Sequence, residues 1–402
     1  MRLAKNQRLR VNHHFDLICF SHLRWSFVFQ RPQHLLSRYA RERRVFFVEE
    51  PMFHDAPDRL ELTTSVEGVH VVVAHLNHAT PDPDAVQAAM LLELTSQQSI
   101  QHYVLWYYTP MALPAGRDLQ PLAIIYDCMD QLSAFKNAPA ELLERERELF
   151  AKADVVFTGG YSLYEEKKDR HHDIHPFPSS VDVPHFQRAR APQTEPEDQQ
   201  PLTHPRLGFY GVIDERMDLD LIAGLAAARP DWNLVFLGPI LKIDEHSLPR
   251  AANIHYLGNK TYAELPRYAS GWDVALLPFA RNQSTEFISP TKTPEYLAAG
   301  LPVVSTSIRD VKTPYGTLGL ALIADSVTDF VAACGAALEA PIGPLLVKAD
   351  EFLAEISWDK TWRAMASLVE RAVQQRSESS SRTVAVASFE RPTRIDGLSA
   401  GE

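Results

Sequence analysis

The sequence has few cysteines and no long hydrophobic run. Three cysteines occur in 402 residues, Cys19, Cys128 and Cys334, and they are too widely spaced for the paired ligands of a structural zinc site. Two of them fall in strand-like segments, which favours buried free thiols in a reducing, cytoplasmic environment. No apolar run reaches the roughly 18 residues needed to cross a bilayer, and no secretory hydrophobic region is present. These absences argue against a disulfide scaffold, a structural zinc domain, a secreted protein and a membrane-spanning protein.

The excess of acidic residues argues against a further class, the proteins that bind nucleic acid without sequence preference. The chain carries 51 acidic and 40 basic residues, a formal net charge of −11. Its first segment, MRLAKNQRLR, has the opposite sign. A basic arm over residues 1–14 is compatible with a solvated tail and with weak contact to anionic lipid at the inner face of a membrane, and both alternatives stay open.

The N-terminal half alternates short apolar runs with amphipathic segments. The runs are continuous rather than alternating in polarity, which indicates strands buried on both faces of a parallel sheet. This pattern predicts a doubly wound β/α domain over residues 15–187. Its strands are expected at 16–20, 45–48, 69–74, 103–107, 123–126 and 155–158, and its helices at 32–39 and 140–153.

The same alternation restarts after a change in composition. Residues 188–205 are rich in Pro, Gln, Glu and Asp, which predicts an interdomain linker. We predict a second β/α domain over 206–345, helices over 346–375 and a disordered tail over 376–402. Ligands in such sheets bind beyond the carboxyl ends of the strands, so the predicted site is the cleft between the domains. The strands of the second domain are expected at 207–210, 234–237, 254–256, 274–277 and 303–305, with a helix at 219–228.

One predicted helix combines a cation with a carboxylate. In the segment SPTKTPEYLAAGLPVVS, Thr293 is a natural N-cap, Pro294 suits the first helical position, and Gly300 suits the helix end. Lys292 is then expected at a helix N-terminus, where free N–H groups favour an anion. Glu295 is able to accept two hydroxyls of a sugar ring. The pair suits a nucleoside diphosphate, although an ordinary capped helix with a surface ion pair would have the same sequence.

Three further loops follow predicted strands, at 21–34, 127–130 and 211–218. Aromatic rings suit sugar faces and guanidinium groups suit acceptor phosphates. For Arg31, capping of the next helix is an alternative role, and for Asp127 a helix or turn cap is the alternative to catalysis. Histidines 22, 34, 171 and 172 are expected to have surface or packing roles, because no carboxylate or cysteine completes a metal-ligand set. The first loop is therefore predicted to line the acceptor side of the cleft through Arg24, Trp25, Gln30 and Arg31.

Taken jointly, these segments resemble the GT-B glycosyltransferases, in particular the retaining family 4 type and its relatives of teichuronic-acid and exopolysaccharide synthesis. The resemblance implies an α/β fold of the GT-B type, with two Rossmann-like domains facing a central cleft. It also implies C-terminal helices that cross back toward the N-terminal domain near Trp358. The matching segments are WSFVFQRPQHL, IIYDCMDQLSAF, ADVVFTGGYSL, PSSVD, GFYGVIDERMDLDLI, NIHYLGNKTYAELPRYASGWDVALLPF and SPTKTPEYLAAGLPVVST.

The resemblance implies roles for individual residues. Glu295 matches the acid that holds the ribose hydroxyls, and the turn at 257–260 matches the one against which the nucleobase stacks. Arg216 and Lys292 match positions that face the diphosphate, where cations and a helix dipole make a divalent metal unnecessary. No cofactor and no metal are expected. The donor-binding set is expected to be Gly211, Arg216, Gly258, Asn259, Glu286, Lys292 and Glu295, and the catalytic set Asp127, Asp130, Arg216 and Lys292.

The sequence departs from the family pattern at two places. Many family members carry two glutamates separated by seven residues, but position 287, where the first would fall, is Phe, and Glu286 lies one residue earlier. The usual histidine after an N-domain strand is not evident, because that segment reads Asp127-Cys-Met-Asp130. The group that acts near the anomeric carbon therefore stays open.

The activity implied by the resemblance is transfer of a sugar from a UDP- or GDP-sugar to a carbohydrate or lipid-linked acceptor. Retention of anomeric configuration and a place in cell-surface polysaccharide synthesis are expected with it. A fold does not fix a function, so two alternatives remain. One is a nucleotide-sugar 2-epimerase or a phosphorylase on the same fold; the epimerase would isomerise the donor without an acceptor. The other is a non-catalytic nucleotide-sugar-binding partner subunit, against which the presence of Lys292 and Glu295 argues.

Overall fold

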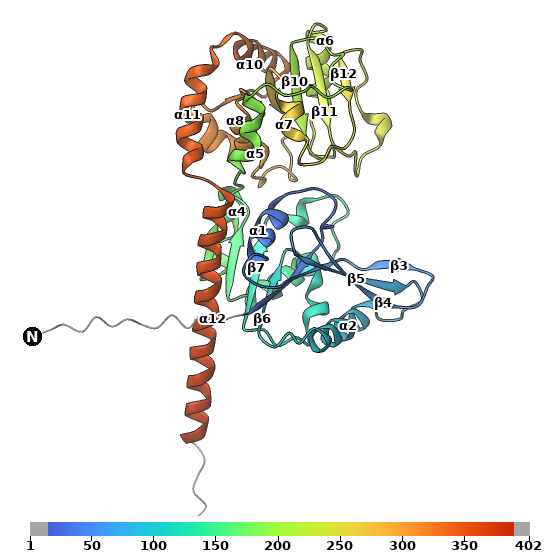
Figure 1. The fold of residues 1–402 in the computed structure, drawn as a ribbon, viewed down its shortest axis with the longest axis vertical. Coiled ribbons are helices and arrows are strands. Elements are labelled where there is room, and N and C mark those ends of the chain that lie inside the picture. The colour runs from blue at the N-terminus through green and yellow to red at the C-terminus, as the bar shows by residue number, and fades with distance from the viewer. Residues whose placement is uncertain (1–14, 390–402) are drawn as a thin grey trace, which may run out of the picture.

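The computed structural model describes residues 15–389, so the predicted basic arm at 1–14 and the end of the predicted tail at 390–402 lie outside the described residues. Two β/α domains lie one above the other, and a long C-terminal helix descends from the second domain along the first (Figure 1). Each domain is built on one mainly parallel sheet with helices against it. The predicted fold class, two doubly wound domains, is confirmed.

The N-terminal domain contains a nine-stranded sheet in the order β3-β5-β2-β1-β6-β7-β8-β9, with β4 antiparallel to β5. All six predicted strands are present. Three strands were not predicted, because β3 and β9 have three residues each and β4 is a largely exposed edge strand. The strands are β1 (Asp16–Ser21), β2 (Val45–Glu49), β3 (Met52–His54), β4 (Arg59–Thr64), β5 (His70–Asn77), β6 (Tyr103–Tyr107), β7 (Ala123–Cys128), β8 (Val155–Thr158) and β9 (Ile174–Pro176), and the helices are α1 (Arg31–Tyr39), α2 (Pro83–Gln97), α3 (Leu142–Lys152) and α4 (Tyr161–Lys167).

The C-terminal domain contains a six-stranded parallel sheet in the order β12-β11-β10-β13-β14-β15. This is the Rossmann strand order, in which the direction of winding reverses beside the first strand and leaves a crevice there. The elements are β10 (Arg206–Tyr210), α6 (Leu219–Ala228), β11 (Asn233–Leu237), β12 (Ile254–Tyr256), α7 (Leu265–Ala269), β13 (Val274–Leu277), α8 (Lys292–Ala299), β14 (Val303–Ser305), α9 (Arg309–Val311), β15 (Ala321–Ile323), α10 (Val327–Glu339) and α11 (Ile342–Ala354).

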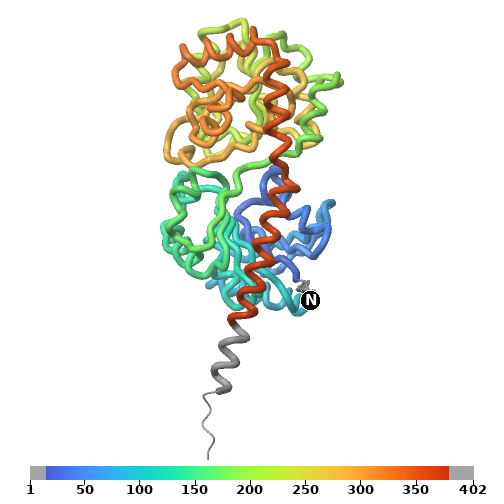
Figure 2. The backbone as a smooth tube through the Cα atoms, turned by 90° about the vertical axis from the view of Figure 1, so that its left-hand side faces the viewer, coloured from blue at the N-terminus to red at the C-terminus, as the bar shows by residue number. Residues whose placement is uncertain are grey.

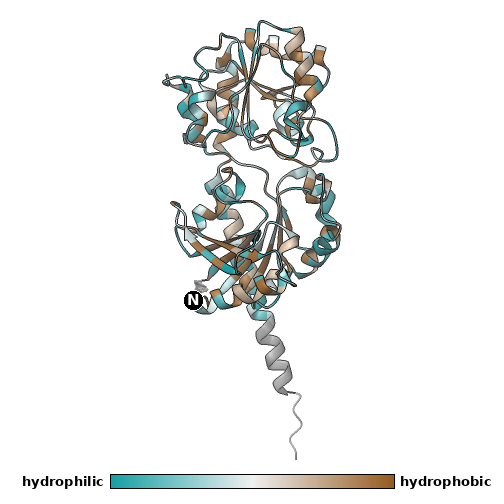
Figure 3. Cartoon of the chain, turned by 90° about the vertical axis from the view of Figure 1, so that its right-hand side faces the viewer, coloured by the Kyte–Doolittle hydropathy of each residue, from teal (hydrophilic) through white to brown (hydrophobic). Residues whose placement is uncertain are grey.

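The strands in the interior of both domains are mostly hydrophobic, while hydrophilic residues are frequent in the helices and loops around them (Figure 3). β1, β2, β6, β8 and β10 are buried at every residue, as expected for strands covered on both faces. Polar side chains at the carboxyl ends of these strands are therefore available to a ligand in the cleft.

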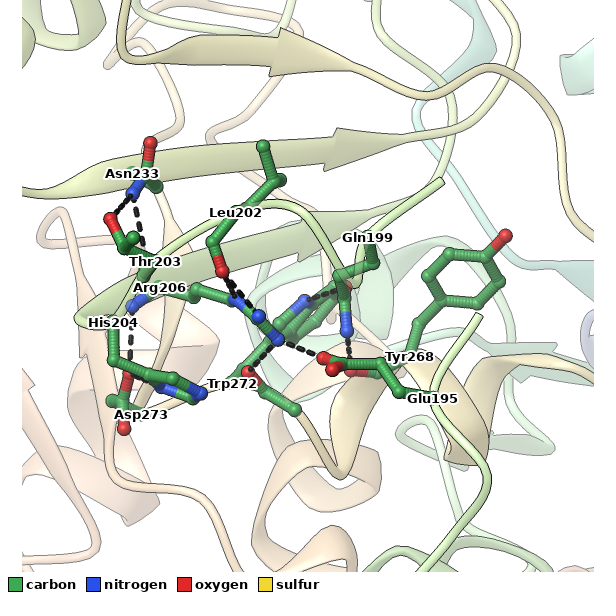
Figure 4. Close-up of polar contacts among 11 residues, drawn as sticks. Glu195, Gln199, Leu202, Thr203, His204, Arg206, Asn233, Tyr268, Trp272 and Asp273 are labelled. Atoms are coloured by element: carbon green, nitrogen blue, oxygen red, sulfur yellow. Dashed lines mark hydrogen bonds and ion pairs between the residues drawn. The ribbon is translucent and has the colours of Figure 1, made fainter. Parts of the chain in front are cut away.

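The predicted linker at 188–205 does not hang free between the domains. Gln199 is fully buried, its side-chain nitrogen donates to the Tyr268 carbonyl at 3.1 Å, and its oxygen accepts from the Trp272 ring N–H at 2.9 Å. Arg206 forms an ion pair with Glu195 of the same segment (Figure 4). The segment is thus held against the C-terminal domain, and the preceding helix α5 (Val183–Gln187) packs there too through Phe186. The chain crosses between the domains before α5.

The C-terminal helices divide between the two domains. α11 packs on the C-terminal domain through Ala349 and Leu353, whereas α12 (Trp358–Phe389) packs on the N-terminal sheet through Trp358 and Met365. The tube view shows α12 running down the N-terminal domain (Figure 2). The helix continues to Phe389, into the segment for which the sequence predicts a disordered tail. No single described helix is long and apolar enough to cross a membrane, although one pair bent by 98°, 327–339 with 342–379, satisfies the length and composition test together.

A buried ion pair joins the start of α1 to the end of β7. Asp127 is fully buried and accepts from Arg31 Nε and Nη2 at 2.9–3.1 Å, while Arg31 Nη1 donates to the Phe177 carbonyl at 2.7 Å. Arg31 is 4% exposed. Removing one member of such a pair leaves the other charge buried without compensation. The geometry gives both residues a structural role in the N-terminal domain.

We predict that Asp127→Ala destabilises the N-terminal domain by about 3–5 kcal/mol, because it leaves the Arg31 guanidinium buried and unpaired. Adding Arg31→Met should recover much of that loss. The exposed pair between Glu165 and Lys168 supplies the control: Glu165→Ala should leave stability close to that of wild type, because solvent screens an exposed pair. Urea denaturation followed by tryptophan fluorescence measures all three variants. If Asp127→Ala is as stable as Glu165→Ala, the structural role is wrong.

Candidate active site

Helix α8 is fixed to strand β10 by two reciprocal hydrogen bonds. The Tyr296 hydroxyl accepts from the Tyr210 backbone N–H at 3.1 Å, and the Tyr210 hydroxyl donates to Glu295 Oε2 at 2.7 Å. Burial raises the pKa of Glu295 to about 7, against the opposing effects of Tyr210 and Lys292. Glu295 therefore titrates near neutrality, and its second carboxylate oxygen has no hydrogen-bond partner among the described residues. It lies at the cavity wall described below.

The helix begins two residues earlier than predicted. α8 starts at Lys292 with Thr291 as the preceding residue, so Thr293 is not the N-cap; its hydroxyl is buried without a partner in the described part of the chain. Pro294 falls inside the first turn, where its missing N–H leaves no bond unmade. Gly300 does end the helix, with φ +86°, as predicted. The predicted placement of Lys292 at the helix N-terminus is confirmed.

Lys292 lies against the turn that follows β10. Gly211 has φ +132°, and a Cβ there would clash with Lys292 Cε and Nζ, so the glycine is what lets the lysine side chain approach the backbone. The ammonium lies 5.5 Å from the centre of the Phe209 ring and has no hydrogen bond or ion pair within residues 15–389. Burial, followed by the charge of Arg216, lowers the pKa of Lys292 to about 8. This cation lacks a counterion of its own.

Arg216 is partly committed to a protein carboxylate. Its Nε and Nη2 donate to Asp214 at 2.7–3.1 Å, which raises the pKa of Arg216 against the effect of burial. Its Nη1 has no partner among the described residues, and the side chain is 24% exposed. Asp214 thus orients the guanidinium and leaves one edge of it for a ligand. The Arg216 Cζ also lies 5.8 Å from the ring centre of Phe135 in the other domain.

Of the two aspartates predicted to be catalytic, only Asp130 faces the cations of the cleft. Burial raises the pKa of Asp130 to about 6, against the charges of Arg216, Arg31 and Lys292. Asp127 is instead the buried partner of Arg31 and is not accessible to a ligand. Asp127 belongs to β7 and Asp130 to the loop that follows it, a difference that the sequence segment DCMD does not reveal.

Arg216, Lys292 and Glu295 line a cavity of about 120 Å³ between the domains, whereas Asp130 lies outside its wall. The cavity includes five of the seven predicted donor-binding residues: Gly211, Arg216, Asn259, Lys292 and Glu295. Gly258 lies in the adjoining turn with φ +74° and open space beside its Cα. Glu286 is exposed and is not part of the cavity wall. The five residues come from three segments, the loop after β10, the turn after β12 and the start of α8, where the Rossmann rule places a ligand.

The predicted acceptor loop divides by role. Glu49 accepts from the Trp25 backbone N–H at 2.7 Å and from Arg24 Nη1 at 2.9 Å, so both residues hold this carboxylate in place. Trp25 is buried and edge-on to Phe47. Gln30 lines the cavity, whereas Arg31 is the buried partner of Asp127 and is not available to an acceptor. The predicted contact of Arg31 with an acceptor is therefore not supported by its position.

The sequence analysis gave His22 only a surface or packing role and gave Tyr262 no role, but both contribute near the domain boundary. Burial, followed by the charge of Lys242, lowers the pKa of His22 to about 4, and its Nδ1 is buried without a partner in the described residues. Tyr262 crosses the domain boundary: its ring stacks with Phe29 at 4.7 Å and with His185 at 4.1 Å. Because protein rings already stack on Tyr262, a nucleobase would need to pack on the adjoining turn instead. No motif marks either residue.

No group of three or more His, Cys, Asp or Glu side chains in residues 15–389 is arranged to hold a metal ion. The positive charge of the site comes from Lys292 and Arg216, and its negative charge from Glu295, Asp130 and Asp214. The arrangement is suited to an anion with hydroxyl groups nearby: a diphosphate at the helix N-terminus and a ribose at Glu295.

Comparison with known proteins identifies the C-terminal domain by sequence. Residues 205–340 match the family model described as glycosyl transferases group 1. A teichuronic acid biosynthesis glycosyltransferase of Bacillus subtilis, TuaH, is 26% identical over 250 residues, which cover 57% of this chain. The match spans 62% of the length of that relative.

Comparison of structures extends over both domains. Sucrose-phosphate synthase from Thermosynechococcus elongatus superposes with a TM-score of 0.66 at 13% identity, over 89% of this chain and 99% of that one. HepE from Anabaena, in complex with UDP and glucose, superposes with a TM-score of 0.63 at 13% identity, over 89% and 99% of the two chains. At this identity the likeness shows the fold. The chain thus has the GT-B fold, and its residues 205–340 are similar to the glycosyl transferases group 1 family.

Proposed function

We propose that this protein is a glycosyltransferase that binds a nucleoside diphosphate sugar between its domains and transfers the sugar to a carbohydrate or lipid-linked acceptor. The observation that carries the proposal is the Lys292 ammonium, which lies at a helix N-terminus against Gly211 with no counterion among the described residues. A diphosphate would supply the missing negative charge. Glu295 is positioned one turn along the same helix for the ribose hydroxyls.

The complexed relatives support the class of donor. HepE is bound to UDP and glucose, and TuaH is named for teichuronic acid synthesis. We infer a UDP- or GDP-sugar donor and a role in cell-surface polysaccharide synthesis for this chain. Its cytoplasmic location and any contact of its basic segment with a membrane remain part of the proposal, because residues 1–14 lie outside the described part of the chain.

The proposed reaction breaks the bond between the anomeric carbon and the diphosphate and forms a bond from that carbon to an acceptor oxygen on the same face. The electron pair of the broken bond goes to the diphosphate, where Lys292 and the free edge of Arg216 offset the charge. The acceptor hydroxyl proton goes to a leaving phosphate oxygen. We assign Asp130 to the positive charge that develops at the anomeric carbon, since it is a carboxylate of the N-terminal domain whose charge interacts with both cations. Configuration would be retained.

We predict that Glu295→Gln weakens nucleoside diphosphate binding about tenfold or more, because hydrogen bonds to a charged group contribute about 1.5–3 kcal/mol. The substituted amide can still accept from Tyr210, so the fold should be preserved. Glu286→Gln is the matched control, since Glu286 is exposed and outside the cavity. Calorimetric titration with UDP, GDP, dTDP and ADP measures both variants. Equal affinities of Glu295→Gln and wild type would refute the assignment of the ribose site.

The affinity for the nucleotide should also depend on pH in two directions. Glu295, with its pKa raised to about 7, becomes charged as pH rises through 7, which favours ribose binding. Lys292, with its pKa lowered to about 8, loses its charge as pH rises through 8, which weakens diphosphate binding. We expect calorimetry between about pH 6 and pH 9 to show the highest nucleotide affinity at a pH between the two pKa values. In Glu295→Gln the increase in affinity between about pH 6 and pH 7 should become smaller. An unchanged pH profile would contradict the assignment of this increase to ionisation of Glu295.

A further inference from the structure

A second cavity lies at the carboxyl ends of β1, β2 and β6, within the N-terminal domain. Its volume is about 270 Å³, and it contains none of the residues assigned above to the donor. Ser21 and Glu49 are the last residues of β1 and β2, Thr109 follows β6, and Gln87 projects from α2. The sheet winds in opposite directions from β1 and β6, so the cavity occupies the crevice where such sheets bind ligands.

Gln87 is the observation that points to a ligand. It is only 6% exposed and lines the cavity, yet its side-chain amide has no hydrogen-bond partner among the described residues. A primary amide carries two donors and an acceptor with two lone pairs. Buried polar side chains are ordinarily hydrogen-bonded, because an unmade bond leaves the cost of desolvation uncompensated. The amide is therefore placed for a partner that enters the cavity.

Other polar groups of the wall are able to form further hydrogen bonds, some as donors and some as acceptors. The Ser21 hydroxyl accepts from the Leu23 N–H at 3.0 Å and the Thr109 hydroxyl from the Met111 N–H at 3.3 Å, which leaves each hydroxyl hydrogen free to donate. The Glu50 carboxylate has no hydrogen bond within residues 15–389 and is free to accept. Donors and acceptors are thus closely mixed, as a ligand with many hydroxyl groups requires.

An aromatic ring at the cavity wall and the negative charge of the lining residues restrict the class of ligand that fits this cavity. Phe53, which is 46% exposed, presents an aromatic ring at the cavity wall, and such rings pack against the C–H face of a pyranose. None of the described residues that line the cavity is Lys, Arg or His, whereas Glu49, Glu50 and Asp84 are carboxylates. A phosphate or carboxylate would face these carboxylates and would find no cation among the lining residues, and the nearby Arg24 is already bound to Glu49.

We propose that this cavity binds an uncharged saccharide unit of the acceptor through Gln87, Ser21, Thr109 and Glu50, and that it excludes a phosphorylated one. The assignment to the acceptor rests on the proposed glycosyltransferase function. Arg24 and Trp25 act as positioning residues, because they hold Glu49 in the cavity wall. The interaction of Glu50 with Lys242 of the other domain places this wall toward the cleft. The cavity thereby selects an acceptor that forms hydrogen bonds with its wall and carries no charge.

The test measures saccharide binding to the full chain without nucleotide. Saturation-transfer NMR is recorded with the methyl α-glycosides of glucose, galactose and mannose, and with glucose 6-phosphate. We expect at least one methyl glycoside to bind wild type, and Gln87→Leu and Phe53→Ala each to weaken that binding about tenfold. Gln97→Leu is the matched control on the exposed end of the same helix and should bind as wild type does. Phe53→Ala alters an exposed side chain, so it keeps the test informative if Gln87→Leu fails to fold.

Three results would overturn the inference: no binding of any methyl glycoside, binding unaffected by both Gln87→Leu and Phe53→Ala, or equal Gln87-dependent binding of glucose 6-phosphate. Calorimetry with the four nucleoside diphosphates on the same samples separates this inference from the proposed function. Nucleotide binding without Gln87-dependent saccharide binding removes the inference alone. Gln87-dependent saccharide binding without nucleotide binding removes the transferase assignment and leaves an uncharged-saccharide site.

Discussion

The site depends on one constraint, the placement of a lysine ammonium in a partly buried position where it forms no ion pair with any described residue. Gly211 makes this possible, since any side chain there would occupy the space of Lys292. Burial disfavours the charged form of Lys292 and therefore lowers its pKa to about 8. Asp214 pairs with Arg216 and not with Lys292, so the charge of Lys292 is left without an ion pair among the described residues. An anion that enters the cavity relieves this cost, which couples ligand binding to the local electrostatics.

The cleft exists only because the two domains are held in a fixed relation. Asp310 of α9 accepts from the Ser162 N–H at 3.0 Å and so caps α4 of the N-terminal domain. Tyr262 stacks across the boundary, and His34 of α1 stacks on Trp358 at 4.5 Å, at the start of α12. These contacts hold together the two domains that jointly line the donor cavity. The second cavity lies within the N-terminal domain and has no cation among its lining residues.

Local sequence signals predicted much of this arrangement, and long-range pairing accounts for the rest. Continuous apolar runs located the central strands, and the lysine, proline and glycine spacing located α8 with Lys292 and Glu295. The sequence could not show that Asp127 pairs with Arg31, because the partner lies 96 residues away and both side chains suit a cleft equally well. The same holds for Gln87, an unremarkable residue of α2 until the folded sheet brings β1 and β6 beside it. The edge strand β4 lacked an apolar run and was missed for that reason.

The most direct measurement compares a nucleoside diphosphate with its nucleoside on wild type and on Lys292→Met. Calorimetric titration with UDP and uridine, or with the pair whose base binds best, isolates the contribution of the two phosphates. If Lys292 holds the diphosphate, wild type should prefer the diphosphate by about tenfold or more, and most of that preference should disappear in Lys292→Met, while affinity for the nucleoside stays unchanged. A preference of equal size in both proteins would show that the diphosphate binds elsewhere and would contradict the account.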